Sequence, residues 1–354
     1  MTLALAERHA AAGAVIADFG ADRLVMRFGD PLEEVAAAHR VGARFDRSFR
    51  PRLRVTGADH RDFLQRMSTA DIAALAPGRG APTLFLERTG RLVDRLAALC
   101  FEDGMLLVGN RERGPFAREW IERYVIAERV DVRDATPETF LFTLVGPEAP
   151  GALRDAYSLD VDSWEPWTHS FASASSSSSQ VVVARAEDVG GRSWFVIGPS
   201  SLASETWDAL AALPSAGEEA YRALRIESGV PAFGEEYTDR SIPLETRMHD
   251  AISFRKGCYL GQEVIARLHN YQRVKRWLVR LWIEGTELPG DGATIRAEGA
   301  EIGTITSAVP TADGVVALGF VERERAESPA ITVTDGSENR AARILPLHPS
   351  GDPS

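Results

Sequence analysis

The pattern of apolar and polar positions predicts a mixture of helices and strands in the first half of the chain. Apolar residues recur every three or four positions in three segments, which predicts amphipathic helices at 31–41, 59–67 and 116–124. Short apolar runs predict strands at 53–56, 96–101, 105–108 and 140–145. Asp103 and Gly104 separate two of these runs and are typical of a hairpin turn. Residues 45–48 are predicted to form a turn.

The second half of the chain changes from mixed elements to short strands. A hairpin is predicted from strands at 181–184 and 194–197 around Gly190 and Gly191, and helices are predicted at 201–213 and 218–226. Further strands are predicted at 277–283, 293–296, 303–308, 315–321 and 330–334. Their even spacing and glycine-rich turns favour a small barrel or sandwich. The serine-rich residues 173–179 predict a flexible surface loop, and the last nine residues predict a loose tail.

Composition and charge narrow the class of protein. The chain has 354 residues, more than one hydrophobic core usually supports, and its 44% apolar and 26% charged residues are typical of folded globular chains. A net charge of −11 repels nucleic acids and anionic membranes at long range, which disfavours direct nucleic-acid binding. No apolar run approaches the roughly 18 residues of a membrane helix, and Glu7 and Arg8 interrupt the start, so we expect a cytoplasmic protein. Two cysteines and seven histidines, without zinc-type spacing, predict no metal site.

The densest chemical signal is the stretch RKGCYLGQE at 255–263. Gly257 is predicted to allow a close backbone approach or a positive φ. Gly261 is predicted to begin a helix, with Glu263 in its first turn, where a negative charge is favourable. Cys258 is therefore predicted to lie just before a helix N-terminus.

The two cysteines have different sequence surroundings. Arg255 and Lys256 precede Cys258, and together with the helix start they favour the thiolate over the thiol. A nucleophile or a soft-metal ligand is one interpretation, and a buried cysteine that behaves as a small hydrophobic residue is the other. Charge and spacing alone leave both open. Cys100 lies within an apolar run and is predicted to be a core residue.

Basic residues are concentrated after this stretch. Between positions 255 and 280 a single acid, Glu263, is set against seven basic residues: Arg255, Lys256, Arg267, Arg273, Lys275, Arg276 and Arg280. In an acidic chain this predicts a focused positive zone, which could hold the anionic tail of a ligand or a nucleic-acid backbone. A basic face that only contacts water is the alternative.

Longer stretches of the sequence resemble one protein family. RKGCYLGQE is similar to the KGCYxGQE signature of the YgfZ-type folate-binding proteins, relatives of the glycine-cleavage T protein, an aminomethyltransferase. Further matches follow in the family's order at 45–48, 55–59, 224–231, 243–245 and 302–307. The resemblance implies an α+β fold of the GcvT type, a ring of three domains in which two α+β lobes and a C-terminal β-barrel surround a central folate-sized hole. The implied bounds are 1–50 with 137–270 for a discontinuous α+β lobe, 51–136 for an inserted α+β lobe, 274–346 for the barrel and 347–354 for a flexible tail.

The same resemblance implies a function and a set of site residues. It implies an accessory protein for iron-sulfur cluster assembly or repair, which binds tetrahydrofolate or a derivative and supports cluster enzymes such as those that modify tRNA. Its partners would be folate, iron-sulfur cluster proteins and the enzymes they serve. Cys258 would be the reactive residue, within a motif that also contains Arg255, Lys256, Gly257, Tyr259, Gly261, Gln262 and Glu263. Folate contacts are expected at Asp94, Arg225, Glu227, Arg267, Arg273 and Lys275.

The chain departs from the transferase pattern at three positions. The transferase pattern has two adjacent acids in this strand. In the stretch GRLVDRL, Asp94 corresponds to the first of them, and Arg95 stands at the position of the second, catalytic one. Phe195 and Tyr221 fall near the positions of a glutamate and an arginine. We therefore expect no aminomethyl transfer, because a cation cannot take the role of the missing anion. The alternative is a folate-dependent one-carbon transferase that uses Asp94 or Glu227, although Asp94 should face the opposite side of its strand from Arg95.

Overall fold

The computed structural model describes residues 5–20, 22–173, 180–189, 191–290, 292–336 and 338–348. The chain divides into two compact units: unit 1 contains Met1–Phe85 and Val93–Tyr221, and unit 2 contains Leu86–Leu92 and Arg222–Ser354. Most of the predicted serine-rich loop, at 174–179, and most of the predicted tail, at 349–354, lie outside the described residues. No helix in the described ranges is long and apolar enough to cross a membrane.

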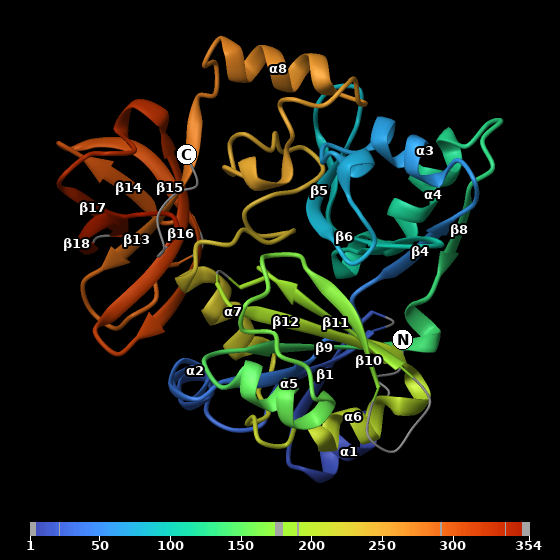
Figure 1. Cartoon of the computed structure of the whole chain (residues 1–354). Helices are drawn as coiled ribbons and strands as arrows, with labels where there is room; N and C mark the ends of the chain where they lie inside the picture. The colour runs from blue at the N-terminus through green and yellow to red at the C-terminus, as the bar shows by residue number, and fades with distance from the viewer. Residues whose placement is uncertain are drawn as a thin grey trace. The chain divides into compact units, whose positions relative to one another are not determined.

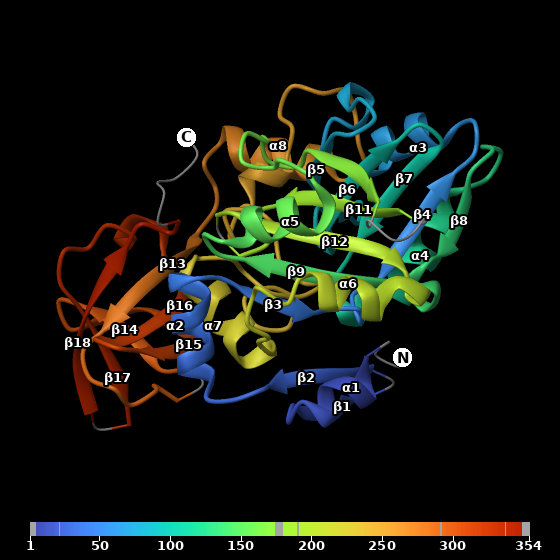
Figure 2. The ribbon, with the colours of Figure 1, turned by 60° about the horizontal axis from the view of Figure 1, so that its bottom comes forward.

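The first sheet of unit 1 has five antiparallel strands in the order β10–β11–β12–β9–β3. Their bounds are His169–Ser173 (β10), Gln180–Ala186 (β11), Ser193–Pro199 (β12), Thr139–Val145 (β9) and Ala43–Asp46 (β3). Helices α5 (Ala149–Tyr157) and α6 (Ala203–Ala209) cover one face of this sheet (Figure 2). Phe140 and Phe142 of β9 pack beneath these helices, and Leu141 packs on the opposite face. The strand predicted at 140–145 is thus a continuous apolar run because both of its faces are buried.

The second sheet of unit 1 has the strand order β5–β6–β7–β4–β8. Its strands are Gly80–Leu86 (β5), Leu92–Phe101 (β6), Gly104–Val108 (β7), Arg52–Thr56 (β4) and Asp131–Asp134 (β8). The predicted hairpin at Asp103 and Gly104 is confirmed, since β6 and β7 pair antiparallel across it. The predicted helices are α3 (His60–Met67) and α4 (Gly114–Tyr124). The two sheets share one core, in which Leu99 of β6 and Phe195 of β12 are both fully buried.

The N-terminal segment of unit 1 contains α1 (Ala6–Ala11), β1 (Val15–Phe19), β2 (Asp22–Arg27) and α2 (Pro31–Arg40). The helix predicted at 31–41 is confirmed, and the Asp30 carboxylate caps it by accepting a bond from the Leu32 N–H. The turn predicted at 45–48 is wrong for its first half, because Phe45 and Asp46 complete β3. Both are buried there, and the Asp46 carboxylate pairs with the His9 ring at 2.9 Å. The helix predicted at 201–213 is also too long, since α6 ends at Ala209.

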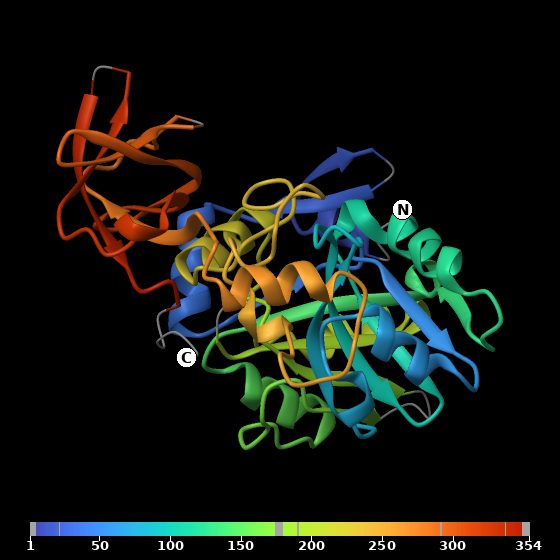
Figure 3. The same cartoon turned by 90° about the horizontal axis from the view of Figure 1, so that it is seen from above.

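Unit 2 contains α8 (Gln262–Asn270) and a closed six-stranded barrel. The boundary between the units falls within α7 (Glu218–Glu227). The barrel strands run in the order β13–β16–β15–β14–β17–β18. They are labelled in Figure 1 and are the orange and red strands of Figure 3. Their bounds are Arg276–Ile283 (β13), Thr294–Ala297 (β14), Ala300–Thr311 (β15), Gly314–Glu322 (β16), Ile331–Asp335 (β17) and Glu338–Leu345 (β18). The predicted barrel is therefore confirmed.

The last barrel strand, β18, was not among the predicted elements. It closes the barrel by pairing with β13, with Arg280 opposite Leu345. Half of its residues are polar, and Ala342 is its one member fully inside the barrel core, with Ile344 partly buried against it. A strand that turns so few apolar side chains inward carries little of the alternation from which strands are predicted.

Candidate functional site

Cys258 lies on an irregular segment that leads into α8, and its side chain is exposed. Helix α8 begins at Gln262, with Gly261 as N-cap at a φ of 82°. A side chain at Gly261 would place its Cβ 2.6 Å from the Glu87 carbonyl oxygen, so glycine lets the start of α8 pack against this turn. The predicted helix start is confirmed. Three residues separate Cys258 from Gln262, so the thiol precedes the first turn of the helix rather than capping it.

The prediction for Gly257 is wrong. Its φ is not in the left-handed region, and a Cβ built there would meet no atom within 4 Å. The backbone of this residue therefore needs neither of the freedoms that glycine provides. The segment is open on the side where a side chain at this position would lie.

Two aromatic contacts lie on either side of Cys258, one to α8 and one within the segment itself. The ring of Phe254 stacks on His269, near the end of α8, with ring centroids 4.2 Å apart. The Lys256 ammonium lies 5.3 Å from the centre of the Tyr259 ring, a cation–π contact. Tyr259 is buried, and burial raises the pKa of its hydroxyl to about 12. Cys258 is thus an exposed thiol on an anchored segment.

Cys100 has the opposite environment. It is fully buried in β6, as predicted, and Nη2 of Arg61 lies 2.9 Å from its sulfur. A nearby cation is therefore not what distinguishes Cys258 from Cys100. The two thiols differ in exposure, because Cys100 is enclosed within β6 and Cys258 is open to solvent.

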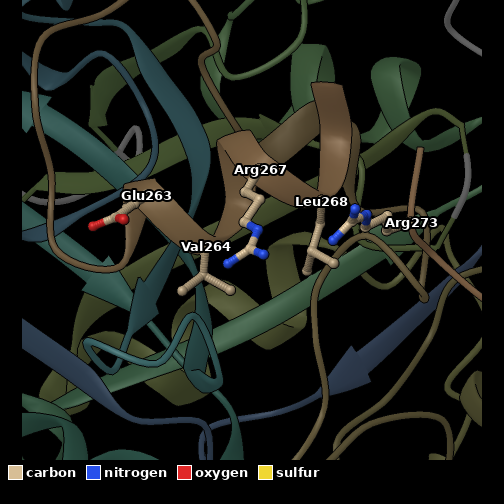
Figure 4. Close-up of a pocket in the computed structure, with 5 residues that line it drawn as sticks. All are labelled: Glu263, Val264, Arg267, Leu268 and Arg273. Atoms are coloured by element: carbon tan, nitrogen blue, oxygen red, sulfur yellow. The ribbon is translucent and has the colours of Figure 1, made fainter. Parts of the chain in front are cut away.

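A pocket of about 270 Å³ lies along α8 and the turn that follows it. It is lined by Glu263, Val264, Arg267, Leu268 and Arg273 (Figure 4). Val264, Arg267 and Leu268 extend from the same side of the helix in this view. Two guanidinium groups beside apolar side chains can hold the carboxylate of a ligand with an apolar body.

The structure divides the predicted positive zone. Arg267 and Arg273 meet at the α8 pocket, and Lys275 is exposed but does not line it. Arg276 pairs with Glu245 at 2.9 Å, and Arg280 donates to the Pro346 and Glu227 carbonyl oxygens. The prediction of one focused positive zone from 255 to 280 is therefore wrong for Arg276 and Arg280, the two arginines of β13. Their guanidinium groups fix the barrel to neighbouring segments.

Arg225 and Glu227, both predicted folate contacts, lie where α7 meets the barrel and do not line the α8 pocket. Arg225 is buried and forms ion pairs with Glu235 and Glu236. The Glu236 carboxylate also accepts bonds from the Ser307 hydroxyl at 2.5 Å, from the Thr306 hydroxyl and from the Ala232 N–H. This buried network joins the chain after α7 to β15.

Unit 1 contains a buried carboxyl at Asp94. Its oxygens accept bonds from the backbone N–H of Arg95 and from the amide of Asn110. Burial raises the pKa of Asp94 to about 7, against the smaller opposing effect of these bonds and of the Arg113 charge. Strand alternation places Arg95 on the face of Leu99, which meets the first sheet, and Asp94 on the other, as predicted.

A second charged cluster in unit 1 was not predicted. Asp188 is largely buried, with 14% of its side chain exposed, and accepts bonds from Arg50 at 2.6 Å, from Arg47 at 3.2 Å and from the Tyr221 hydroxyl. Burial alone would raise the pKa of Asp188, but the charges of Arg50 and Arg47 outweigh it and hold the pKa below its usual range. The Arg50 guanidinium lies 5.3 Å from the centre of the Phe195 ring.

This cluster and Asp94 are neighbours within unit 1. Nε of Arg50 donates to the Gly109 carbonyl at 3.1 Å, and the next residue, Asn110, donates to Asp94. Phe195 and Tyr221, the two other positions that depart from the transferase pattern, both contact the cluster. The residues come from separate strands and loops, so spacing could not have found them. The one available signal was the 45–48 match, which contains Arg47.

Within the described ranges no group of three or more His, Cys, Asp or Glu side chains is arranged to hold a metal ion.

Comparison with known proteins adds the family and the fold. The GCVT N-terminal domain family matches residues 5–256. "Putative transferase At1g60990", a chloroplastic protein of Arabidopsis thaliana, is 30% identical over 90% of this chain and 73% of its own length. The aminomethyltransferase of Thermotoga neapolitana is 27% identical over 90% of this chain and 89% of its own. The glycine cleavage system aminomethyltransferase T of Bartonella henselae has a TM-score of 0.85 at 22% identity and covers 98% of this chain and 97% of its own. This likeness confirms the predicted fold of α+β lobes with a C-terminal barrel.

Proposed function

Since the chain belongs to the GCVT N-terminal domain family, we propose that it is a folate-binding accessory protein of the YgfZ type, which supports iron-sulfur cluster assembly or repair through Cys258. The observation that carries this proposal is the exposed thiol on an anchored segment before α8. Packing does not account for this cysteine. An accessible thiolate can exchange with a persulfide, attack an electrophile or bind iron transiently, and each of these reactions needs access to solvent.

The α8 pocket fits the tail of a folate. Arg267 and Arg273 offer guanidinium groups for carboxylates, and Val264 and Leu268 offer apolar surface for the ring next to them. We propose that these residues hold the glutamate tail of tetrahydrofolate or a derivative. When bound, the folate would supply one-carbon chemistry, and the protein's own groups would position it.

Cys258 is the residue on which the proposed role depends. In cells that lack this protein, the wild-type chain should restore the activity of an iron-sulfur enzyme that modifies tRNA, and Cys258→Ser should not. Cys100→Ser is the matched control, and it should restore activity because Cys100 is a core residue. The readout is the modified nucleoside in total tRNA, with protein abundance measured in parallel. Full restoration by Cys258→Ser would remove the thiol from the mechanism.

The folate tail gives a separate test. Tetrahydrofolate with a polyglutamate tail should bind about fivefold more tightly than the monoglutamate, because two exposed ion pairs together contribute about 1 kcal/mol. The preference should shrink as salt rises. Titration calorimetry at two salt concentrations measures both.

Two variants make this folate test specific. Arg267→Gln combined with Arg273→Gln should abolish the preference for polyglutamate. Arg118→Gln, at an exposed position on α4, removes a charge without touching the pocket and should keep it. Equal affinities for the two folates in the wild-type chain, or tight tRNA binding without a preference for polyglutamate, would contradict the assignment.

A second candidate function is a folate-dependent one-carbon transferase. It is favoured by Asp94, because a carboxyl with a pKa of about 7 can give and take protons near neutral pH. Arg95 argues against it, since its charge is opposite to that of the family's catalytic group. Release of ammonia from an aminomethyl carrier protein that depends on tetrahydrofolate and is lost in Asp94→Asn would favour this candidate over the first.

A further inference from the structure

The barrel carries a second pocket, of about 350 Å³, at the place where β13 and β18 separate. The two strands pair from Arg280 onward, and the first residues of β13 have no β18 partner. Trp277 and Val279, from the part of β13 that pairs with β16 but not with β18, form one wall. The other walls come from residues 326–329 and 343–347. A gap between two strands at the mouth of a small barrel is a common place for a ligand.

The walls of this barrel pocket are held by bonds to other parts of unit 2. The Leu278 N–H donates to the Glu245 carbonyl at 2.9 Å, and the Arg280 guanidinium donates to the Pro346 carbonyl at 2.9 Å. A Cβ at Gly229 would lie 1.9 Å from the Leu347 carbonyl oxygen, so the chain after β18 packs closely on the end of α7. The pocket is therefore formed before any ligand arrives, which lowers the entropic cost of binding.

The charges at the barrel pocket favour an anion. Arg247 and Arg343 line it, and Glu327 is the one acidic side chain in the lining. The Arg247 guanidinium lies 5.2 Å from the centre of the Trp277 ring, and the Arg343 guanidinium lies 4.9 Å from that of Trp282. Trp277 lines the pocket, whereas Trp282 lies on the outer face of β13, so only the Arg247 guanidinium is oriented by a ring of the pocket. A planar guanidinium binds a carboxylate through two parallel bonds.

The backbone at Arg247 has an uncommon conformation. Its φ is 57°, in the left-handed region that residues with a side chain seldom adopt. Such a conformation costs free energy, and it is kept only where the surrounding structure requires it. Here it accompanies a guanidinium that lines the pocket beside Trp277.

We propose that the barrel pocket is a binding site for a small monocarboxylate with an apolar body. Arg247 binds the carboxylate, Arg343 adds positive charge at the edge of the lining, and Trp277 and Val279 contact the apolar part. One carboxylate matches a lining with two positive charges and one negative charge. The site is separate from the α8 pocket, with which it shares no lining residue, and it does not depend on folate binding.

The test uses the full chain and two probes of nearly the same shape. Para-fluorobenzoate carries the charge, and para-fluorobenzamide does not, and fluorine NMR titrations give the affinity of each. We expect the benzoate to bind about tenfold more tightly, since bonds between charged groups are roughly twice as strong as neutral ones. Arg247→Gln should remove most of this difference and Arg343→Gln a smaller part of it, with the amide affinity unchanged.

Two controls locate the binding. Arg118→Gln changes the net charge by the same amount at a residue that does not line the barrel pocket, and it should leave both affinities unchanged. Arg267→Gln should also leave them unchanged, and loss of benzoate binding in this variant would assign the probe to the α8 pocket instead. Equal affinities for the two probes, or no binding of the benzoate at millimolar concentration, would overturn the proposal. Because the comparison of acid and amide is made on the wild-type chain, it does not depend on how well the variants fold.

Discussion

Replacement of Glu236 by alanine is expected to lower the free energy of unfolding by about 3–5 kcal/mol, the usual cost of removing one partner from a buried ion pair. The Glu236 side chain is fully buried, and its carboxylate accepts bonds from Arg225, from the Ala232 N–H and from the Ser307 hydroxyl. Alanine would leave the buried Arg225 charge without its fully buried partner. Urea unfolding followed by circular dichroism measures the loss.

Glu235 provides a matched control for Glu236. It stands next in the chain and also pairs with Arg225, but its side chain is 30% exposed. Glu235→Ala should therefore cost about 1 kcal/mol or less. Arg225→Met combined with Glu236→Leu should recover part of the stability, because an apolar pair of similar volume leaves no buried charge. Equal losses from Glu235→Ala and Glu236→Ala would show that burial does not set the strength of this network.

Replacement of Asp94 by asparagine is expected to change stability by an amount that depends on pH. The pKa of Asp94 is raised from 3.8 to about 7 by burial, so between these values the folded protein holds a proton that the unfolded chain has lost. The contribution of Asp94 to the free energy of unfolding is therefore fully present at acidic pH and is lost as pH rises through about 7. Three units of pKa correspond to at most about 4 kcal/mol.

Asparagine carries no charge at any pH, so it removes this penalty. Asp94→Asn should gain stability relative to the wild-type chain on going from pH 4.5 to pH 8, by a few kcal/mol at most. The measured quantity is the change in the effect of the substitution between pH 4.5 and pH 8. Any cost of the new amide that is the same at both pH values cancels in this change. Asp155→Asn, at an exposed position on α5, is the control and should show the same effect at both pH values. A pH-independent effect of Asp94→Asn would contradict a neutral, buried carboxyl.

Local patterns were sufficient for much of the fold. Helix α2, the β6–β7 hairpin and five of the barrel strands follow from periodicity and turn residues, because in these elements one face is clearly apolar or a glycine marks the turn. The start of α8 followed from Gly261 for the same reason. The strand β18 could not be predicted, since it turns mostly polar side chains outward and is held by pairing with β13.

The site was harder to predict because its residues depend on tertiary contacts. Cys258 and the two arginines of the α8 pocket, Arg267 and Arg273, stand close together in sequence, so the sequence alone revealed this group. The cluster around Asp188 brings together residues more than 100 positions apart, and the raised pKa of Asp94 comes from burial, which charge counting does not measure. Arg276 carries the same charge as Arg273, but only the structure reveals that Glu245 already binds it.

The pairing of β13 with β18 also affects how the protein is made. Arg280 can find its place opposite Leu345 only after nearly all of the barrel sequence has left the ribosome, so the ring cannot close during earlier synthesis. Contacts between such distant positions also form slowly once the chain is complete. Until then the β13 edge and the apolar residues of the unfinished barrel are exposed. Barrel closure is therefore a late step in biogenesis.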